Sequence, residues 1–345
     1  MLKHGGRILE AAQQYQIPVS EWLDLSTGIN PNGYPVPTIP DSIWQRLPEE
    51  QDGLITAAQK YYQCQSLIAV AGSQAAIQSL PLLRTRGTTG IVTPSYAEHT
   101  YAWEKAGHKI VHISSNEINQ HISELDTLIL VNPNNPTACT FSQKQCLSWL
   151  ENLNQRQGWL IIDEAFIDST PELSLSQLQP LAGLIILRSI GKFFGLAGLR
   201  AGFVLAEPTI LNNLNKLLGP WTLSNPGRFV CAHALQDTSW HKQMRLQLLQ
   251  QSRRLQALLI NYQLKPAGST QLFQWVQTED AAHIHQQLAT QAVFTRLFSE
   301  PTSLRFGLPA NEPEWQHLES ALQYLAALCR HKNRPSMQHI LQQSI

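Results

Sequence analysis

The sequence predicts an α/β protein whose large domain has three layers, with helices on both sides of a mainly parallel sheet, and whose smaller domain is α+β. Two observations lead to this prediction. Short apolar runs alternate with helix-like segments through the middle of the chain, as in βαβ units. These runs are apolar on both faces, which is typical of strands covered by helices on both sides. We place the large domain at residues 49–235, the small domain at residues 1–48 and 236–330, and a tail at residues 331–345.

The composition indicates a globular protein that acts on small molecules. Of the 345 residues, 43% are hydrophobic and 14% are charged, so the chain can bury enough apolar surface to offset its ordering entropy. The 25 basic and 25 acidic residues cancel, and no run of Lys and Arg is longer than a pair. This argues against nucleic acid and membrane surfaces as partners. We expect a small-molecule substrate and a second copy of the chain as partners.

Targeting and metal signals are not found in the sequence. The first residues lack the basic-then-apolar pattern of a signal peptide, and nowhere do about 18 apolar residues occur together. We therefore expect a cytoplasmic protein. The five cysteines are far apart without a C-x-x-C pair, which indicates reduced thiols rather than disulfides or a zinc site. His283 and His285 lack a third neighbouring ligand, so no metal is expected.

The elements follow in chain order. The first 48 residues contain five prolines from Pro31 to Pro48 and are expected to be irregular, wrapping over another part of the protein. The large domain then alternates strands and helices. Its predicted strands are Gly90–Thr93, Lys109–Ile113, Thr127–Val131, Trp159–Ile162, Leu184–Leu187 and Gly202–Leu205. Its predicted helices are Ser73–Arg84, Ala97–Ala106 and Ser142–Gln155.

The pattern changes after Asn225-Pro226-Gly227. Leu residues alternating with Gln and Arg predict one long helix, Phe229–Tyr262. The predicted elements of the small domain are strands Leu272–Val276, Ala292–Phe294 and Ser303–Phe306, and helices Ala281–Ala289 and Glu312–Cys329. The tail is polar and is expected to be frayed.

No nucleotide-binding or hydrolase motif fits the predicted sheet. The chain has no G-x-G-x-x-G, and Gly191-Lys192 lacks the earlier glycine of a P-loop. It also has no G-x-S-x-G and no H-E-x-x-H. Instead, polar residues stand at the ends of the predicted strands, where open α/β sheets bind their ligands.

Two of these polar segments are uncharged. Gly72 and Ser73 open a helix, where glycine allows close approach and the helix N-terminus favours phosphate, although an ordinary N-cap gives the same pattern. The segment from Asn132 to Thr137 follows a strand and contains three Asn and two Pro. The prolines hold its amides in place, with a plain turn as the alternative.

The other two segments carry charge. Asp163 ends an apolar strand, and because a buried acid without a cation is costly, it should face a positive group. Lys192 precedes two phenylalanines, lies among glycines and has Arg200 nearby. This confined setting favours a nucleophilic amine, with a surface lysine as the alternative.

In their combination, order and spacing, the four segments resemble the pyridoxal-phosphate enzymes of the aspartate-aminotransferase fold, fold type I, over most of the chain. The resemblance implies that Lys192 forms the Schiff base with the cofactor aldehyde. Asp163 would pair with the pyridinium nitrogen, which keeps the ring an electron sink. Asn135 would hydrogen-bond the ring 3-oxygen, and Tyr96 would stack on the ring. The residues implied to hold the cofactor phosphate are Ser73, Gln74, Ser189 and Arg200.

Within this family, several segments look most like the threonine-phosphate decarboxylases of cobalamin biosynthesis. They are His4–Gly6, Trp22–Pro31, Pro94–His99, Asp163–Asp168 and Leu304–Pro309. Phe166 stands where family members often have a Tyr that bonds the 3-oxygen, and it agrees with this subfamily. The implied reaction is decarboxylation of L-threonine O-3-phosphate to (R)-1-amino-2-propanol O-2-phosphate. Histidinol-phosphate aminotransferase is the next relative by resemblance, and it makes transamination the alternative.

The substrate contacts implied by the resemblance come mostly from the small domain. Whichever bond at Cα lies perpendicular to the ring is the one that breaks, so the grip on the substrate chooses the reaction. Arg305 would clamp the carboxylate, and Arg296 would assist at the carboxylate or the phosphate. The other predicted substrate-binding residues are His4, Gly5, Asn30 and Asn135, with a solvent-exposed His4 as the alternative. Lys192 would return a proton to Cα.

The same resemblance implies a homodimer, in which Tyr61 or Tyr62 reaches the cofactor phosphate of the neighbouring subunit. A catalytically silent protein that uses the fold to bind a partner is a third reading. It is disfavoured because a silent scaffold has no physical need for Lys192, Asp163 and Arg200 together.

Overall fold

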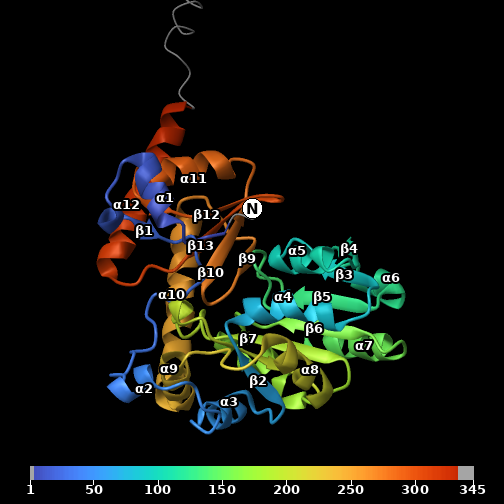
Figure 1. Cartoon of the computed structure of the whole chain (residues 1–345). Helices are drawn as coiled ribbons and strands as arrows, with labels where there is room; N and C mark the ends of the chain where they lie inside the picture. Colours follow the sequence, from blue (N-terminus) through green and yellow to red (C-terminus); the bar gives the residue numbers. More distant parts are fainter. Residues whose placement is uncertain (1–3, 333–345) are drawn as a thin grey trace, which may run out of the picture. The chain divides into compact units, whose positions relative to one another are not determined.

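The structure is a computed structural model that describes residues 4–332 (Figure 1). The chain divides into two compact units. Unit 1 consists of Ile29–Ser252 and Gly268–Leu272 among the described residues. Unit 2 consists of residues 4–28, Arg253–Ala267 and residues 273–332.

Unit 1 is built on a seven-stranded sheet in the order β2-β8-β7-β6-β5-β3-β4. β8 runs against the other strands, which are parallel to one another. The strands are β2 Leu67–Val70, β3 Thr88–Val92, β4 Lys109–Ile113, β5 Thr127–Val131, β6 Trp159–Asp163, β7 Leu184–Ser189 and β8 Gly202–Leu205. The predicted mainly parallel sheet is confirmed, and β2 is a strand that we did not predict.

Helices cover both faces of this sheet. The connection from β3 through α5 to β4 runs along the sheet in one direction, and that from β5 through α7 to β6 runs in the other. Right-handed crossovers therefore place α5 and α7 on opposite faces. The helices are α2 Asp41–Gln45, α3 Leu54–Tyr62, α4 Ser73–Leu83, α5 Glu98–Lys105, α6 Ile118–His121, α7 Gln143–Asn154 and α8 Pro208–Leu218. The three predicted layers are thus present.

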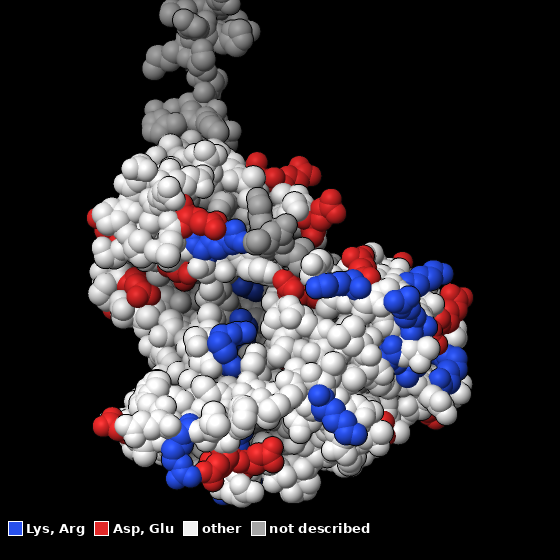
Figure 2. Space-filling view, viewed as in Figure 1, with Lys and Arg blue, Asp and Glu red and all other residues white. Residues whose placement is uncertain are grey.

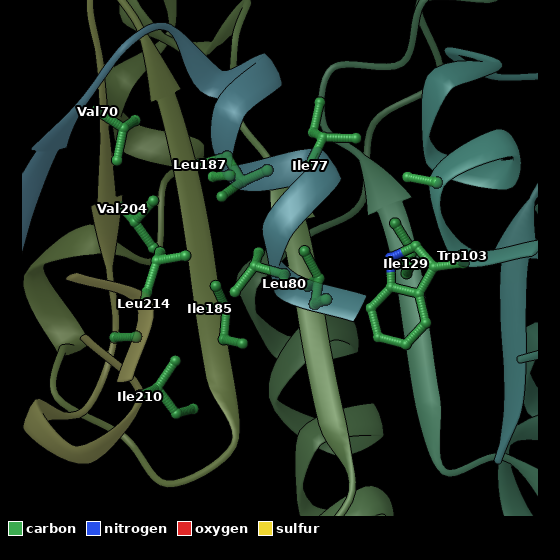
Figure 3. Packing of buried hydrophobic residues seen from close by; sticks show 14 of the residues in the cluster. Val70, Ile77, Leu80, Trp103, Ile129, Ile185, Leu187, Val204, Ile210 and Leu214 are labelled. Atoms are coloured by element: carbon green, nitrogen blue, oxygen red, sulfur yellow. The ribbon is translucent and has the colours of Figure 1, made fainter. Parts of the chain in front are cut away.

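The core of unit 1 explains why these helices stay on the sheet. On one face, α4, α5 and α8 bring Ile77, Trp103 and Leu214 into a buried cluster with strand residues such as Ile129 and Ile185 (Figure 3). Burying side chains of this size stabilises the fold by about 1.5–3 kcal/mol each. The elements that carry polar residues at the strand ends are therefore rigid.

The long helix predicted at Phe229–Tyr262 is two helices, α9 Asn225–Gln236 and α10 Thr238–Asn261. Asp237 lies between them at ψ 79°. Its carboxylate accepts hydrogen bonds from the Ser239 hydroxyl at 2.6 Å and the Trp240 backbone N–H at 2.9 Å. An aspartate that caps a new helix in this way ends the previous one. The break escaped prediction because the apolar periodicity continues across it.

Unit 2 contains the antiparallel strands β12-β13-β10 and the parallel pair β1 with β11. Its strands are β1 Leu23–Asp24, β10 Phe273–Gln277, β11 Val293–Phe294, β12 Arg296–Ser299 and β13 Thr302–Gly307. Its helices are α1 Ile8–Tyr15, α11 Ala281–Thr290 and α12 Glu312–Lys332, while the short strand β9 Gly268–Ser269 lies in unit 1. The predicted α+β character is confirmed. The prediction that the start of the chain is irregular was wrong. Ile8, Ala11, Ala12 and Tyr15 repeat at helical spacing and form α1.

The units differ from the predicted division of the chain. Residues 29–48 and 236–252, which we had placed in the small domain, belong to unit 1. The first of these segments is tied to unit 1 because the Asn30 and Tyr34 backbone N–H groups donate to the carbonyls of Lys192 at 3.0 Å and Phe194 at 2.8 Å. Of the predicted tail, residues 331 and 332 continue α12, and the rest lies outside the described residues. The domain boundaries as folding units stay a prediction.

The surface and the helices were also searched for membrane and metal features. Between residues 4 and 332, no helix is long and apolar enough to cross a membrane, and no group of three His, Cys, Asp or Glu side chains forms a metal site. Basic and acidic side chains are interspersed over the face shown in Figure 2, in line with the zero net charge.

Candidate active site

A pocket of about 130 Å³ lies in unit 1, next to the carboxyl ends of β2, β5, β6 and β7. This edge is where open α/β sheets bind ligands. The lining residues are Gly72, Ser73, Gln74, Tyr96, Val131, Asn135, Asp163, Ala165, Phe166, Ser189, Lys192 and Arg200. All the residues predicted to hold the cofactor are therefore brought together in one pocket, and their individual roles stay predictions.

Part of the lining suits an anion. α4 begins at Ser73, so its first N–H groups have no partner within the helix. The Arg200 guanidinium covers Gly72 so closely that an added Cβ there would lie 2.8 Å from Nη2. Gly72 also has φ 73°, so another residue would be strained as well as displace the arginine. Ser189 contributes a hydroxyl, which accepts from the Gly191 N–H at 3.2 Å.

The side-chain amide of Gln74 bonds two neighbouring side chains, and the predicted contact of Gln74 with the cofactor phosphate stays a prediction. Its Nε2 donates to Glu98 Oε2 at 2.8 Å, and its Oε1 accepts from the Tyr96 hydroxyl at 3.1 Å. The amide thus positions the Tyr96 ring, and the backbone of Gln74 is the part that can face an anion. Burial, with Glu98 and Asp163, raises the pKa of Tyr96 to about 12, so the phenol stays protonated at neutral pH.

Asp163 ends β6 with only 3% of its surface exposed. Its Oδ1 accepts from the Ala165 backbone N–H at 3.0 Å. Its Oδ2 lies 3.1 Å from Nε2 of His99, on the first turn of α5. We predicted a positive group beside this acid, and the neighbour is an imidazole that we had not considered.

Lys192 lies in the loop after β7, and this loop is firmly held. Asn30 donates from its side-chain Nδ2 to the Phe193 carbonyl at 2.8 Å, in addition to its backbone bond to Lys192. Phe193 and Phe194 are fully buried and anchor the loop. The Lys192 Nζ lies 5.5 Å from the centre of the Phe166 ring. Asn30, predicted to bind substrate, therefore uses its amide to fix the lysine loop.

The segment after β5 separates the roles of its three asparagines. Asn132 bonds the backbone of Phe141 through both amide atoms, at 3.1 and 3.0 Å. Asn134 donates to the Pro94 carbonyl at 2.8 Å and to Thr137 Oγ1 at 2.7 Å. These two side chains hold the loop through their own hydrogen bonds, and Asn135 is the asparagine that lines the pocket.

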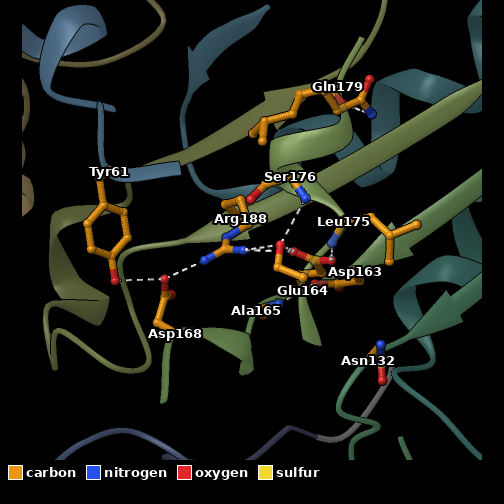
Figure 4. Close-up of polar contacts among 12 residues, drawn as sticks. Tyr61, Asn132, Asp163, Glu164, Ala165, Asp168, Leu175, Ser176, Gln179 and Arg188 are labelled. Carbon is orange, nitrogen blue, oxygen red and sulfur yellow. Dashed lines mark hydrogen bonds and ion pairs between the residues drawn. The ribbon is translucent and has the colours of Figure 1, made fainter. Parts of the chain in front are cut away.

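A buried charge cluster adjoins the ends of β6 and β7 (Figure 4). Arg188 pairs with Glu164 at 2.7 Å and with Asp168 at 2.5 Å, and all three side chains are almost fully buried. Burial lowers the pKa of Arg188, but Asp168 and Glu164 outweigh it and raise that pKa above its ordinary value. The cluster joins the residue after Asp163 to the residue before Ser189, so it fixes two pocket residues relative to each other.

The same cluster also contacts Tyr61 and Tyr62. The Tyr61 hydroxyl donates to Asp168 Oδ1 at 3.0 Å, and Tyr62 is 2% exposed with the Arg188 guanidinium 4.6 Å from its ring. Burial and Asp168 hold the pKa of Tyr61 well above its ordinary value. Both rings therefore contact the charge cluster of unit 1, and the reach of Tyr61 or Tyr62 to the cofactor phosphate of a neighbouring subunit stays a prediction.

Unit 2 has a cavity of its own, of about 240 Å³. His4, Gly5 and Arg296, all predicted to bind substrate, line it together with Arg7 and His285. Burial and Arg7 lower the pKa of Arg296, and burial and Arg296 lower that of His285. A protein surface that gathers cations in this way is suited to an anionic ligand.

Arg305, the predicted carboxylate clamp, faces Arg296 across the sheet of unit 2. The two are paired positions of β13 and β12. Arg305 is 5% exposed, and its Nη2 donates to the Ser26 carbonyl at 2.9 Å. Burial and Arg296 lower the pKa of Arg305 to about 9, against an opposing effect of Asp24. Two like charges on paired strand positions repel each other, and an anion bound next to both would reduce this repulsion.

The comparisons with known proteins bear on these two sites. The chain matches the family described as aminotransferase class I and II over residues 48–323. The chain belongs to the class I and II aminotransferase family. Among curated members, a threonine-phosphate decarboxylase from Pseudomonas aeruginosa is 48% identical over 322 residues, which is 93% of this chain and 97% of the relative. Another, from Sinorhizobium sp, is 36% identical over 326 residues, 92% and 97% of the two chains.

Solved structures of aminotransferase-family proteins share the fold. Histidinol-phosphate aminotransferase from Sinorhizobium meliloti, in complex with pyridoxal-5'-phosphate, has a TM-score of 0.81 at 19% identity, covering 95% of this chain and 96% of that chain. L-threonine-O-3-phosphate decarboxylase from Porphyromonas gingivalis has a TM-score of 0.71 at 18% identity, covering 87% and 98%. The predicted fold type I architecture is confirmed.

Three residues around the pocket were missed at the level of sequence. His99 and Glu98 stand on the helix after Tyr96, inside a segment that we quoted for its resemblance without giving either residue a role. Arg188 is a cation within an apolar strand, and such a residue must find buried carboxylates. The buried ion pairs of Arg188 could therefore have been predicted from the sequence. The partners of His99 and Glu98 could not, because they depend on the packing of α5 against β6 and α4.

Proposed function

We propose that this aminotransferase-family chain is a pyridoxal-phosphate enzyme that decarboxylates L-threonine O-3-phosphate to (R)-1-amino-2-propanol O-2-phosphate. The observation that carries the proposal is the 48% identity, over nearly the full length of both chains, to a threonine-phosphate decarboxylase. The pocket of unit 1 supports it because its chemistry matches the cofactor. The place in cobalamin biosynthesis follows from this reaction and is part of the proposal.

The donor set of the pocket fits a phosphorylated pyridine aldehyde. Such a group needs an anion site, an acid for its ring nitrogen and an amine for its aldehyde. Arg200, Ser189 and the α4 N-terminus with Ser73 would hold the phosphate. Asp163 would hold the ring nitrogen in its protonated form, and Lys192 is the one amine among the lining residues. Tyr96 and Asn135 would contact the ring and its 3-oxygen, and Asn135 would also border the substrate.

When bound, pyridoxal phosphate withdraws electrons from Cα of an amino acid and so weakens the bonds there. The protein decides which bond breaks and supplies the proton. In the proposed reaction the bond from Cα to the carboxylate breaks, CO₂ leaves, and one proton is added to Cα. Lys192 would donate that proton from Nζ. Tyr96 stays protonated at neutral pH because its pKa is about 12, so it is not the base of the reaction.

The anionic groups of the substrate would be bound by the cations of unit 2. Arg305 presents a planar guanidinium that can bind a carboxylate through two parallel hydrogen bonds, and Arg296 would assist. His4 and the Gly5 backbone would contact the phosphate. An added Cβ at Gly5 would come within 2.4 Å of the Ser26 carbonyl, so this position keeps its backbone close to the cavity.

A histidinol-phosphate aminotransferase-like reaction is the second candidate. A curated histidinol-phosphate aminotransferase from Buchnera aphidicola is 29% identical over 209 residues, 56% of each chain. Its coverage is lower than that of the decarboxylases. In this alternative the bond from Cα to hydrogen breaks, and a keto product accumulates instead of CO₂.

One assay separates the candidates. The purified chain is incubated with pyridoxal phosphate and L-threonine O-3-phosphate, and released CO₂ is measured beside keto products. Release of one CO₂ for each substrate consumed supports the decarboxylase, and a keto product without CO₂ supports the aminotransferase. Borohydride reduction followed by peptide mass spectrometry should place the cofactor on Lys192. A label elsewhere, or no label, contradicts the proposed site.

We further propose that the enzyme is a cytoplasmic homodimer. The homodimer rests on the family resemblance, which also implies that Tyr61 or Tyr62 reaches the cofactor phosphate of the neighbouring subunit. Light scattering at micromolar concentration should give about twice the chain mass of 38.7 kDa. A strict monomer would contradict this part while leaving the reaction unaffected.

A further inference from the structure

We propose that Ser26 is a positioning residue that ties the His4–Gly6 segment to Arg305, so that unit 2 presents one preformed site to the anionic groups of the substrate. This inference rests on the substrate part of the proposed function. Ser26 is 0% exposed and lines the same cavity of unit 2 as His4 and Arg296. Its hydroxyl bonds the segment and its backbone carbonyl bonds the arginine, so it would act on the substrate through these two partners.

The Ser26 hydroxyl joins the segment to the end of β1. Its Oγ accepts a hydrogen bond from the Gly6 backbone N–H at 2.8 Å and donates one to Asp24 Oδ1 at 2.6 Å. One hydroxyl can make both bonds, because it has one donor and two acceptor sites. The Ser26 backbone N–H also donates to Asp24 Oδ1, at 2.9 Å. The hydroxyl proton is therefore directed at Asp24, and its lone pairs are left for Gly6.

The Ser26 carbonyl joins the same segment to the arginine. Arg305 Nη2 donates to this oxygen at 2.9 Å. Gly5 lies so close to it that an added Cβ would be 2.4 Å from the oxygen. Because the crowding atom belongs to the backbone, it cannot turn away as the end of a flexible side chain can. Gly5 and the Arg305 guanidinium are therefore both placed by one carbonyl group.

Ser26 itself is firmly held, whereas the segment that it bonds has no regular structure. The Leu25 backbone N–H donates to the Phe294 carbonyl and the Gly307 N–H donates to the Leu25 carbonyl, both at 2.8 Å. The His4–Gly6 segment forms neither helix nor strand, so it lacks the backbone bonds that fix such elements. A bond from a rigid neighbour orders it before a ligand binds, which reduces the conformational entropy lost on binding.

The test removes the hydroxyl while leaving the backbone of residue 26 in place. In Ser26→Ala, the backbone bonds to Asp24 and Arg305 can still form, and only the bonds of Oγ are lost. Ser26→Cys keeps a side chain of similar size, but its thiol is a weak hydrogen-bonding group. Ser26→Thr keeps the hydroxyl and is the conservative variant that should restore function.

Ser303→Ala is the matched control. Ser303 is also 0% exposed and lies on β13, two residues before Arg305, but it is not among the residues that line the cavity. Its Oγ donates to the Pro301 carbonyl at 2.7 Å. For each variant, kcat and KM are measured with L-threonine O-3-phosphate. The dissociation constant of inorganic phosphate is measured by calorimetry on protein loaded with pyridoxal phosphate, so that the anion site of unit 1 is occupied.

We expect Ser26→Ala and Ser26→Cys to raise both KM and the phosphate dissociation constant by about 3- to 10-fold, the effect of losing one hydrogen bond. The value of kcat should change little, because the loss concerns binding rather than the chemical step. Ser26→Thr should restore most of the affinity, and Ser303→Ala should bind both ligands as the wild type does. If the added methyl group prevents Ser26→Thr from folding, the comparison of Ser26→Ala with Ser303→Ala decides.

The outcomes separate this inference from the proposed function. Unchanged KM and phosphate affinity in Ser26→Ala would overturn the positioning role, and so would wild-type behaviour of Ser26→Cys, since volume would then be sufficient. An equal loss in Ser26→Ala and Ser303→Ala would show a general packing effect and would also overturn it. If the wild-type chain releases no CO₂, the proposed reaction is contradicted, while the phosphate titration, which needs no turnover, still decides the role of Ser26.

Discussion

The two units treat their buried arginines in opposite ways. In unit 1, Arg188 has two carboxylates within 2.7 Å, and its pKa is raised. In unit 2, Arg305 faces another arginine, and its pKa is lowered to about 9. A buried arginine with two carboxylates is part of the scaffold, whereas a buried arginine whose pKa is lowered by a second arginine is suited to bind an anionic ligand. The comparison assigns the chemistry to unit 1 and recognition of the anion to unit 2.

The pockets of the two units repeat this difference. The pocket of unit 1 combines an amine, an acid and a cation, Lys192, Asp163 and Arg200. The cavity of unit 2 is lined by two guanidinium groups, Arg7 and Arg296, together with His285 and the acid Glu10. A site with both signs of charge suits proton transfer, whereas a site of mostly one sign suits binding. Substitutions in the two units should therefore change different kinetic constants.

The largest effect is expected for Lys192→Ala. Without the amine there is no group to bond the aldehyde or to return the proton, so kcat should fall by at least about 10⁴-fold. The affinity for a phosphorylated substrate analogue, measured by calorimetry, should stay near that of the wild type. A variant that keeps more than a hundredth of the activity would contradict the assignment of chemistry to this residue.

The next largest effect is on the free energy of unfolding, which should fall in the Arg188 variant but not in the Arg305 variant. Arg188→Met leaves Glu164 and Asp168 as buried charges without their cation, and we expect it to lower the free energy of unfolding by about 3–5 kcal/mol. Urea denaturation followed by circular dichroism measures this change. Arg254→Met is the control, because its ion pair with Glu312 is exposed and should contribute at most about 1 kcal/mol.

Arg305→Met should behave differently in the same denaturation experiment. Its folded-state pKa lies below the ordinary value, so the protonated form is disfavoured by folding, and removing it should not destabilise the chain. If Arg305→Met lowered the free energy of unfolding as much as Arg188→Met, both arginines would have a structural role. The proposed difference between the two units would then be wrong.

The sequence predicts the residues at the ends of strands better than it predicts which side chains bond one another. Lys192 and Asp163 stand at the ends of apolar strands, where topology alone brings them to one edge, so both were predicted. Gln74 was predicted to hold the cofactor phosphate, but the bonds of its side-chain amide to Glu98 and Tyr96 were not predicted. Such choices between partners depend on the packing of α4 against α5, which no periodicity encodes.

The kinetic effect of Arg305→Met comes third in size. We expect KM for L-threonine O-3-phosphate to rise by about 10- to 100-fold, the loss of hydrogen bonds to a charged group, with kcat reduced much less. Arg305→Lys keeps the charge without the planar fork and should give an intermediate KM. Steady-state kinetics on both variants measure this. A change confined to kcat would place Arg305 with the chemistry instead of with binding.

The smallest effect is expected in the pH dependence of the wild type. The folded-state pKa of Arg305 is about 9, below its ordinary value, so the side chain is positive at neutral pH and loses its charge as the pH rises through that value. A bound anion favours the charged form, so KM should be constant below about pH 8. Above pH 9 it should rise, by up to about tenfold for each further pH unit.

The Arg305→Met variant is the control for this profile, since it has no guanidinium to titrate. Its KM should be high and independent of pH over the same range, and the curves of the two proteins should converge at high pH. If kcat changed with pH as strongly as KM, Arg305 would act in the chemical step as well as in binding, whereas a rise in KM alone would support a role in binding only.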